Sequence, residues 1–166
     1  MSEEIRANLA ILVPSLRRFA LSLCGNRDEG DDLVQTACLK ALDRAKQFEP
    51  GTRLDSWMFR IVQTTFLDTR RMSARRGPAA PPEALEALSD DGRDARRSED
   101  RLLLGRIREA VGDLPEEQRL VIGLVAIEGY TYKETAEILD IPVGTVMSRL
   151  ARARARLLPL TEGSVK

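Results

Sequence analysis

Apolar residues recur at steps of three and four along most of this chain, and no other feature constrains the fold as strongly. The first such stripe consists of Ile5, Leu9, Leu12, Leu16, Phe19 and Leu23. This spacing places its members on one face of an α-helix. No segment alternates apolar and polar residues as a half-buried strand does. The sequence therefore predicts an all-α protein.

The predicted helices form two groups separated by a proline-containing stretch. Pro78, Pro81 and Pro82 stand in a polar, acidic segment that disfavours regular structure. We predict a first module over 1–76, a flexible linker over 77–98, a second module over 99–160 and a tail over 161–166. Because the linker can bury little apolar surface, we expect the modules to move relative to each other.

The composition argues against several kinds of function. The 166 residues include no histidine, the commonest general base and metal ligand. Cys24 and Cys38 have no paired spacing and no companion ligands, so we expect buried free thiols, no metal and no other cofactor. No phosphate-binding glycine loop or nucleophile motif is present, and we expect no enzyme. No apolar run approaches the roughly 18 residues of a membrane span, so we expect a soluble, cytoplasmic protein.

The formal net charge is zero, yet the charges are unevenly distributed. Acidic residues dominate between Glu99 and Asp140, and arginines dominate after Ile141. Such asymmetry within one chain indicates contact with nucleic acid.

The arginine-rich segment has the pattern of a helix-turn-helix. Thr131 and Glu134 form a T-x-x-E capping box, Asp140 to Pro142 form a turn, and a new helix starts near Val143. Val146, Leu150, Ala153 and Leu157 share one face of that helix. The opposite side carries the predicted DNA-binding residues Thr145, Ser148, Arg149, Arg152 and Arg156. Such a helix can enter a major groove, where arginines bind phosphates or guanine edges. The alternative is a basic face that is only solvated.

A second basic segment lies along and after the third predicted helix. Its arginines are Arg60, Arg70, Arg71, Arg75 and Arg76. Trp57, Phe59 and Phe66 are interleaved with them, and aromatic rings beside arginines can stack on unpaired bases. The helical spacing favours a core position for Trp57 and leaves both interpretations open for Phe59 and Phe66.

Three segments resemble the extracytoplasmic-function (ECF) sigma factors of bacterial RNA polymerase. They are "DDLVQTACLKAL" (31–42), "LDSWMFRIVQTTFLDTRR" (54–71) and "YTYKETAEILDIPVGTVMSRLARARARL" (130–157). They occur in the family's order and cover both modules. "FALSLCGN" and "FEPGT" look most like the subgroup of the general stress response.

The resemblance implies a function and partners for each module. The first module is similar to sigma region 2, a bundle of three or four helices that docks on core polymerase and melts the −10 element. The polymerase would contact Asp32, Leu33 and Gln35. The −10 element would contact Arg53, Arg60, Thr64, Arg70 and Arg71. The second module is similar to region 4, which reads the −35 element. Such factors are usually held inactive by an anti-sigma protein.

The sequence departs from the family pattern at three positions. Thr36 and Thr64 stand where the family often has Glu and Asn, and Asp140 stands at the turn where it often has Gly. Aspartate tolerates the left-handed conformation better than most residues, so we expect the turn to form.

Two other functions remain as alternatives. A sigma-mimicking regulator would sequester an anti-sigma factor without binding DNA, and it would not need a basic recognition helix. An ordinary helix-turn-helix repressor would not need the "DLVQ" motif of the first module.

Overall fold

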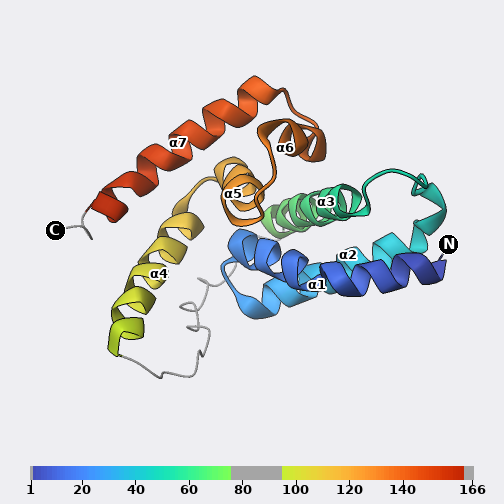
Figure 1. Ribbon diagram of the computed structural model, residues 1–166, viewed down its shortest axis with the longest axis horizontal. Coiled ribbons are helices and arrows are strands. Elements are labelled where there is room, and N and C mark those ends of the chain that lie inside the picture. Colours follow the sequence, from blue (N-terminus) through green and yellow to red (C-terminus); the bar gives the residue numbers. More distant parts are fainter. Residues whose placement is uncertain (1, 76–94, 163–166) are drawn as a thin grey trace.

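The computed structural model describes residues 2–75 and 95–162 (Figure 1). These residues form helices and no strand, which confirms the all-α prediction. The first group contains α1 (Ser2–Cys24), α2 (Arg27–Asp43), a 3₁₀ turn (Ala45–Gln47) and α3 (Leu54–Arg75). The second contains α4 (Ala95–Asp113), α5 (Glu116–Ile122), a π-helical turn (Gly123–Ile127), α6 (Tyr132–Leu139) and α7 (Val143–Glu162).

The predicted linker and tail lie mostly outside the described residues. The described chain resumes at Ala95, where α4 begins, so residues 95–98 of the predicted linker are helical. Helix α7 continues to Glu162, two residues into the predicted tail.

Helices α1, α2 and α3 form an antiparallel bundle around the predicted apolar stripe. Gly25, with φ 71°, ends α1 in the left-handed region, and the side chain of Asn26 caps α2 by accepting from the Asp28 amide at 2.8 Å. A Cβ at Gly30 would lie 3.3 Å from the Leu21 backbone nitrogen. Glycine therefore lets α1 and α2 cross closely.

Helix α1 serves as a core helix of this bundle. Its segment Glu3–Cys24 is long and apolar enough to cross a membrane by length and composition alone, which the sequence analysis had not expected. In the structure, however, Leu16, Phe19 and Leu23 are fully buried against the other helices. Packing accounts for the apolar residues on this inner face, whereas only 28% of the apolar window of α1 is buried in the structure.

The second module is built on the predicted helix-turn-helix. The Thr131 hydroxyl accepts from the Glu134 amide at 3.0 Å, and the Glu134 carboxylate accepts from the Thr131 amide at 3.1 Å, so the capping box is confirmed. Asp140 adopts φ 55° and ψ 50°, the left-handed conformation expected at the turn. Helix α7 then packs on α5 and α6.

The two modules pack against each other and share one continuous apolar core (Figure 1). Helix α6 lies against α3, and α5 with the π turn lies against α1. A Cβ at Gly123, in the π turn, would come within 2.9 Å of the Phe19 ring. The absence of a side chain at Gly123 therefore permits this close approach.

Candidate nucleic-acid interface

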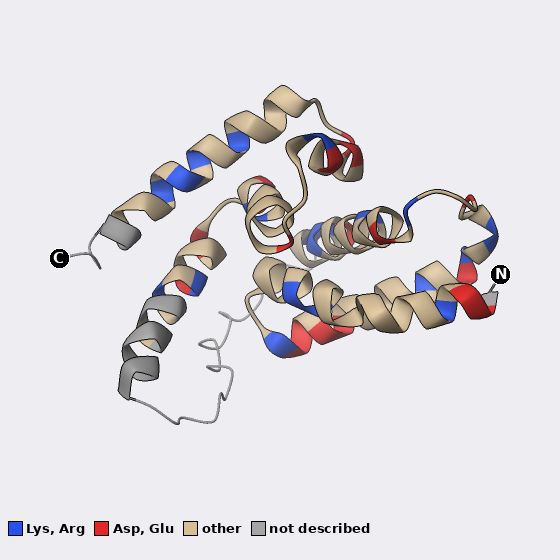
Figure 2. Ribbon diagram, viewed as in Figure 1, with Lys and Arg blue, Asp and Glu red and all other residues tan. Residues whose placement is uncertain are grey.

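Helix α7 presents a charged outer face and an apolar inner face. Val146, Leu150 and Ala153 are buried against α5 and α6. Arginines recur along the middle part of α7 (Figure 2). Arg152 and Arg156 are exposed and form no ion pair within the described part of the chain. Both guanidinium groups can therefore bind an external anion.

The hydroxyl of Ser148 donates a hydrogen bond within α7. Ser148 is exposed, and its Oγ donates to the Gly144 carbonyl at 3.0 Å. The oxygen lone pairs remain available, so Ser148 can accept from an amino group in a major groove, such as cytosine N4 or adenine N6. Thr145 lies one turn earlier and is partly exposed.

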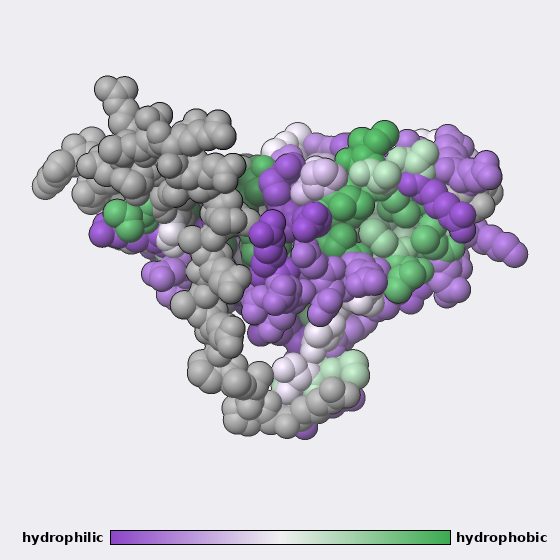
Figure 3. Space-filling view, turned by 90° about the horizontal axis from the view of Figure 1, so that it is seen from below, coloured by the Kyte–Doolittle hydropathy of each residue, from purple (hydrophilic) through white to green (hydrophobic). Residues whose placement is uncertain are grey.

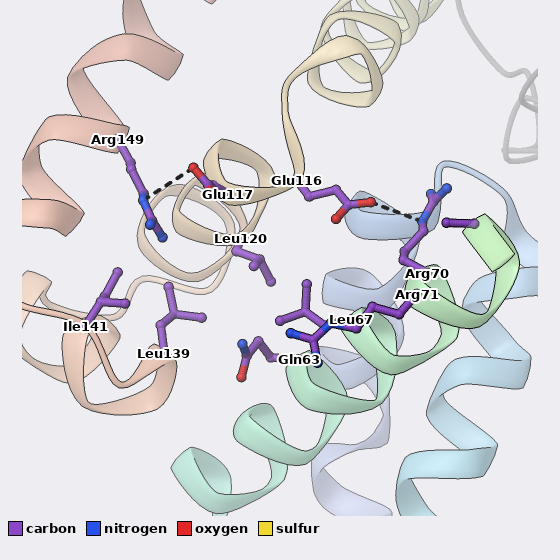
Figure 4. Close-up of a pocket in the computed structure, with 11 residues that line it drawn as sticks. Gln63, Leu67, Arg70, Arg71, Glu116, Glu117, Leu120, Leu139, Ile141 and Arg149 are labelled. Carbon is purple, nitrogen blue, oxygen red and sulfur yellow. Dashed lines mark ion pairs between the residues drawn. The ribbon is translucent and has the colours of Figure 1, made fainter.

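Arg149 occupies the border between the outer face and the body of the second module. Its Nε lies 3.8 Å from Oε2 of Glu117 on α5, and its side chain is 24% exposed. It lines a cavity of about 580 Å³ between α3, α5 and α7 (Figure 4). The structure thus holds Arg149 near an acidic partner, unlike Arg152 and Arg156.

The predicted −10 residues form a stripe on α3. Arg60, Thr64 and Arg71 follow one another at spacings of four and seven, which keeps them on one side of α3, and Arg53 immediately precedes the helix. Thr64 and Arg71 are exposed, and the Thr64 hydroxyl donates to the Ile61 carbonyl at 3.1 Å. Three of the five predicted residues thus share one side of α3, and Arg53 lies just before its first residue.

The second module engages three of these arginines. Arg60 donates to the backbone carbonyls of Glu137 and Ile138 at the end of α6, the latter at 3.3 Å. Arg53 forms ion pairs with Asp55 and with Glu134 of α6. Arg70 lies to the side of the stripe, with its Nε 3.6 Å from Oε1 of Glu116.

The aromatic residues of α3 do not offer rings to bases. Phe59 is 1% exposed and Phe66 is 2% exposed, so the base-stacking interpretation is wrong for both. Their apolar area is part of the shared core, where Phe59 packs edge-on against Tyr130 with ring centroids 5.3 Å apart. Trp57 is partly buried and packs on Phe48 with centroids 5.2 Å apart.

The predicted polymerase-binding residues divide between surface and core. Asp32 and Gln35 are exposed on one face of α2, whereas Leu33 is 7% exposed and belongs to the core. Leu33 therefore packs in the core behind this face and is not part of the exposed surface. Leu39, one turn beyond Gln35, is 62% exposed and adds an apolar side chain that the sequence analysis missed. Figure 3 shows apolar surface on the α1–α2 side of the molecule.

A small polar cluster links the start of α3 to Tyr130, which lies two residues before α6, the first helix of the helix-turn-helix. The Tyr130 hydroxyl donates to Oδ2 of Asp55 at 2.9 Å, and Arg53 donates to the same oxygen at 2.7 Å. Burial alone would raise the pKa of Asp55, but the hydrogen bonds from Arg53 and Tyr130, with that from the Ser56 amide, lower it below its usual value. Burial, followed by the bond to Asp55, raises the pKa of Tyr130.

Arg119 is a buried residue that the sequence analysis did not identify. Its Nη1 donates to the Leu23 carbonyl at the end of α1, and its guanidinium lies 5.9 Å from the centre of the Phe66 ring. Burial, together with the nearby charge of Arg70, lowers the pKa of Arg119. No local signal marks it, because both of its partners belong to the first module.

The geometry defines a helix-turn-helix DNA-binding protein with an attached helical bundle. The described residues contain no group of three His, Cys, Asp or Glu side chains able to hold a metal. Both cysteines are free and partly buried.

Comparison with known proteins identifies the family. Residues 104–157 match the family described as Sigma-70, region 4, and residues 9–63 match the Sigma2 domain of PhyR. The ECF RNA polymerase sigma factor EcfG of Rhodopseudomonas palustris (strain TIE-1) is 37% identical over 161 residues, covering 96% of this chain and 86% of that protein. The chain therefore belongs to the ECF sigma factors of RNA polymerase, and it is an alternative sigma factor of transcription initiation.

Solved structures agree with this family. The sigma factor RpoE, in complex with the anti-sigma factor NepR from Bartonella quintana, superposes with a TM-score of 0.81 and 30% identity, covering 96% of this chain and 98% of that chain. CnrH, in complex with the cytosolic domain of CnrY, superposes with a TM-score of 0.70 and 27% identity, covering 98% and 90%.

Proposed function

We propose that this sigma factor reads the −35 element with α7 and the −10 element with the outer stripe of α3. The exposed basic face of α7, opposite its buried face, is the observation that carries the proposal. The −35 contacts are made by Thr145, Ser148, Arg149, Arg152 and Arg156. The −10 contacts are made by Arg53, Arg60, Thr64, Arg70 and Arg71.

The −35 contacts divide by chemistry. Ser148 accepts from a base amino group, because its proton is held by Gly144. Arg149, near the start of α7, reaches a guanine edge once it leaves Glu117. Arg152 and Arg156 bind phosphates, which add affinity without sequence preference.

Core polymerase docks on the exposed face of α2. Asp32 and Gln35 supply polar groups there, Leu39 supplies apolar area, and Leu33 keeps the helix in place from within the core. Because the RpoE and CnrH structures are complexes with other proteins, of which NepR is an anti-sigma factor, we also propose that this chain is regulated by an anti-sigma protein in the cytoplasm.

A second candidate function is a sigma mimic that only sequesters an anti-sigma protein. The match of residues 9–63 to the Sigma2 domain of PhyR is the observation that favours it. The exposed arginines of α7 favour the DNA-binding function, because a mimic has no use for them.

The test is promoter-directed transcription in vitro with core polymerase. We expect transcripts only when the chain is added, and loss of most product in an Arg152→Ala/Arg156→Ala double variant. A Lys133→Ala variant, which removes an exposed cation of α6 outside the proposed contacts, is the matched control. If the wild-type chain directs no transcription from any promoter that carries intact −35 and −10 elements, the sigma mimic is favoured.

A further inference from the structure

The cavity between α3, α5 and α7 has the size and the walls of a small-molecule site. Its volume of about 580 Å³ lies within the range of roughly 300–1,000 Å³ that such sites occupy. Leu67, Leu120, Leu139 and Ile141 line it, and Figure 4 shows Leu67, Leu120 and Leu139 in its middle part. These side chains can pack against an apolar body.

Arginines lie at both ends of this cavity (Figure 4). Arg70 lies at one end beside Glu116, and Arg149 lies at the other end beside Glu117. The nitrogen-to-oxygen distances of these pairs are 3.6 and 3.8 Å, which is longer than a hydrogen bond. The two carboxylates therefore leave the donors of both guanidinium groups available.

Arg71 also lines the cavity and has no acidic partner. Its side chain is exposed and forms no ion pair or hydrogen bond with the rest of the described chain. Three arginines thus line the cavity against two glutamates, which leaves an excess of positive charge. Guanidinium groups bind carboxylates and phosphates through two parallel hydrogen bonds. The charges of the lining therefore favour an anionic group.

Gln63 is an independent indication of a ligand. It is 9% exposed and lines the cavity, yet its side-chain amide has no hydrogen-bond partner among the described residues. Buried polar groups in folded proteins are almost always paired, because an unpaired one is costly. Figure 4 shows the Arg71 side chain running back along α3 toward Gln63. A molecule in the cavity can pair with both groups at once.

We propose that this cavity binds a small organic anion that carries a carboxylate or phosphate group on an apolar body. The apolar body packs on Leu67, Leu120 and Leu139, and the anionic group accepts hydrogen bonds from Arg71 and the Gln63 amide. The proposed function assigns Arg71 to the −10 element and Arg149 to the −35 element. An occupied cavity therefore competes with promoter DNA, and this last step rests on the proposed function.

The experiment uses the full chain and the fluorescent anion anilinonaphthalene sulfonate (ANS), which has an aromatic body. A fluorescence titration measures its affinity, and four compounds are then tested for displacement of the dye: octanoate, octyl phosphate, octanol and inorganic phosphate. We expect octanoate or octyl phosphate to displace ANS at concentrations at which octanol and inorganic phosphate do not. The more effective of the two anions identifies the anionic group that the site prefers.

Three substitutions locate the site. Arg71→Gln removes the unpaired charge, and Gln63→Leu removes the unpaired amide at similar volume. We expect each to weaken the binding of ANS and of the displacing anion roughly tenfold. Arg75→Gln is the matched control, because Arg75 is an exposed arginine of α3 outside the cavity lining, and its affinities should be unchanged. Gln63→Leu should not lower Tm, since no hydrogen bond within the chain is lost.

Two results would overturn the inference. One is displacement of ANS by octanol or inorganic phosphate as effective as displacement by the amphipathic anions. The other is an Arg71→Gln chain that is folded by circular dichroism and binds ANS as tightly as Arg75→Gln.

Competition with DNA is measured separately, by titrating a −35 duplex with and without a saturating amount of the displacing anion. We expect weaker duplex binding when the anion is present, and a smaller effect in Arg71→Gln. Anion binding that leaves duplex affinity unchanged would overturn the competition alone. A wild-type chain that binds the anion but no duplex even in its absence would instead refute the proposed function.

Discussion

Replacing Tyr130 by phenylalanine tests whether the polar cluster between α3 and the second module stabilises the fold. The change removes the hydroxyl that donates to Asp55 at 2.9 Å and keeps the ring that packs on Phe59. A hydrogen bond to a charged group contributes about 1.5–3 kcal/mol. Asp55 retains its bonds from Arg53 and the Ser56 amide. We therefore expect a loss near the lower limit, about 1.5 kcal/mol, or roughly 3–6 °C in Tm.

The stability lost in Tyr130→Phe should depend on pH. The pKa of Asp55 is lowered in the folded chain, so its contribution is present above the unfolded value of about 3.9 and is lost as pH falls through the lower folded value. The pKa of Tyr130 is raised by burial, by the bond to Asp55 and by the charge of Glu128, with Arg53 opposing. Its contribution is present below the unfolded value of about 10 and declines at higher pH.

Urea unfolding followed by circular dichroism at about pH 3, 7 and 10.5 measures this dependence. We expect the difference in the free energy of unfolding between wild type and Tyr130→Phe to be largest at pH 7. Tyr132→Phe is the control, because Tyr132 forms no side-chain hydrogen bond within the described residues. A difference below about 0.5 kcal/mol at pH 7, or one that is the same at all three pH values, would refute the reasoning.

Three further predictions concern single side chains. Thr131→Ala removes the cap of α6 and should lower the free energy of unfolding by about 1 kcal/mol, measured by thermal denaturation. Arg149→Ala should reduce the difference in binding free energy between −35 duplexes of different sequence by about 1–3 kcal/mol. Arg156→Ala should weaken binding to all of these duplexes and reduce the dependence of affinity on salt concentration by about one phosphate contact. Titrations at several salt concentrations distinguish the two effects. Burial raises the pKa of the Cys24 thiol to about 11, so iodoacetamide should modify it slowly at pH 8 until urea is added; alkylation at the rate of a free thiol would contradict this.

The sequence alone determined those features that depend on residues within a few positions of each other. The Thr131–Glu134 capping box, the left-handed Asp140 and the two faces of α7 all follow from neighbours along one helix or turn. Backbone geometry and helical periodicity act over this short range, so the helix-turn-helix could be predicted. The same holds for the apolar stripe of α1.

Only the tertiary structure decided which predicted residues are free to act. Leu33, Phe59 and Phe66 are buried because helices of the bundle cover them. Arg60 and Arg119 bind carbonyls 78 and 96 residues away in the chain. Patterns within a helix show that an arginine lies on a surface, but they do not show what meets that surface. The contacts of Arg53 and Arg60 with α6 depend on such distant pairings, and no spacing in the sequence encodes them.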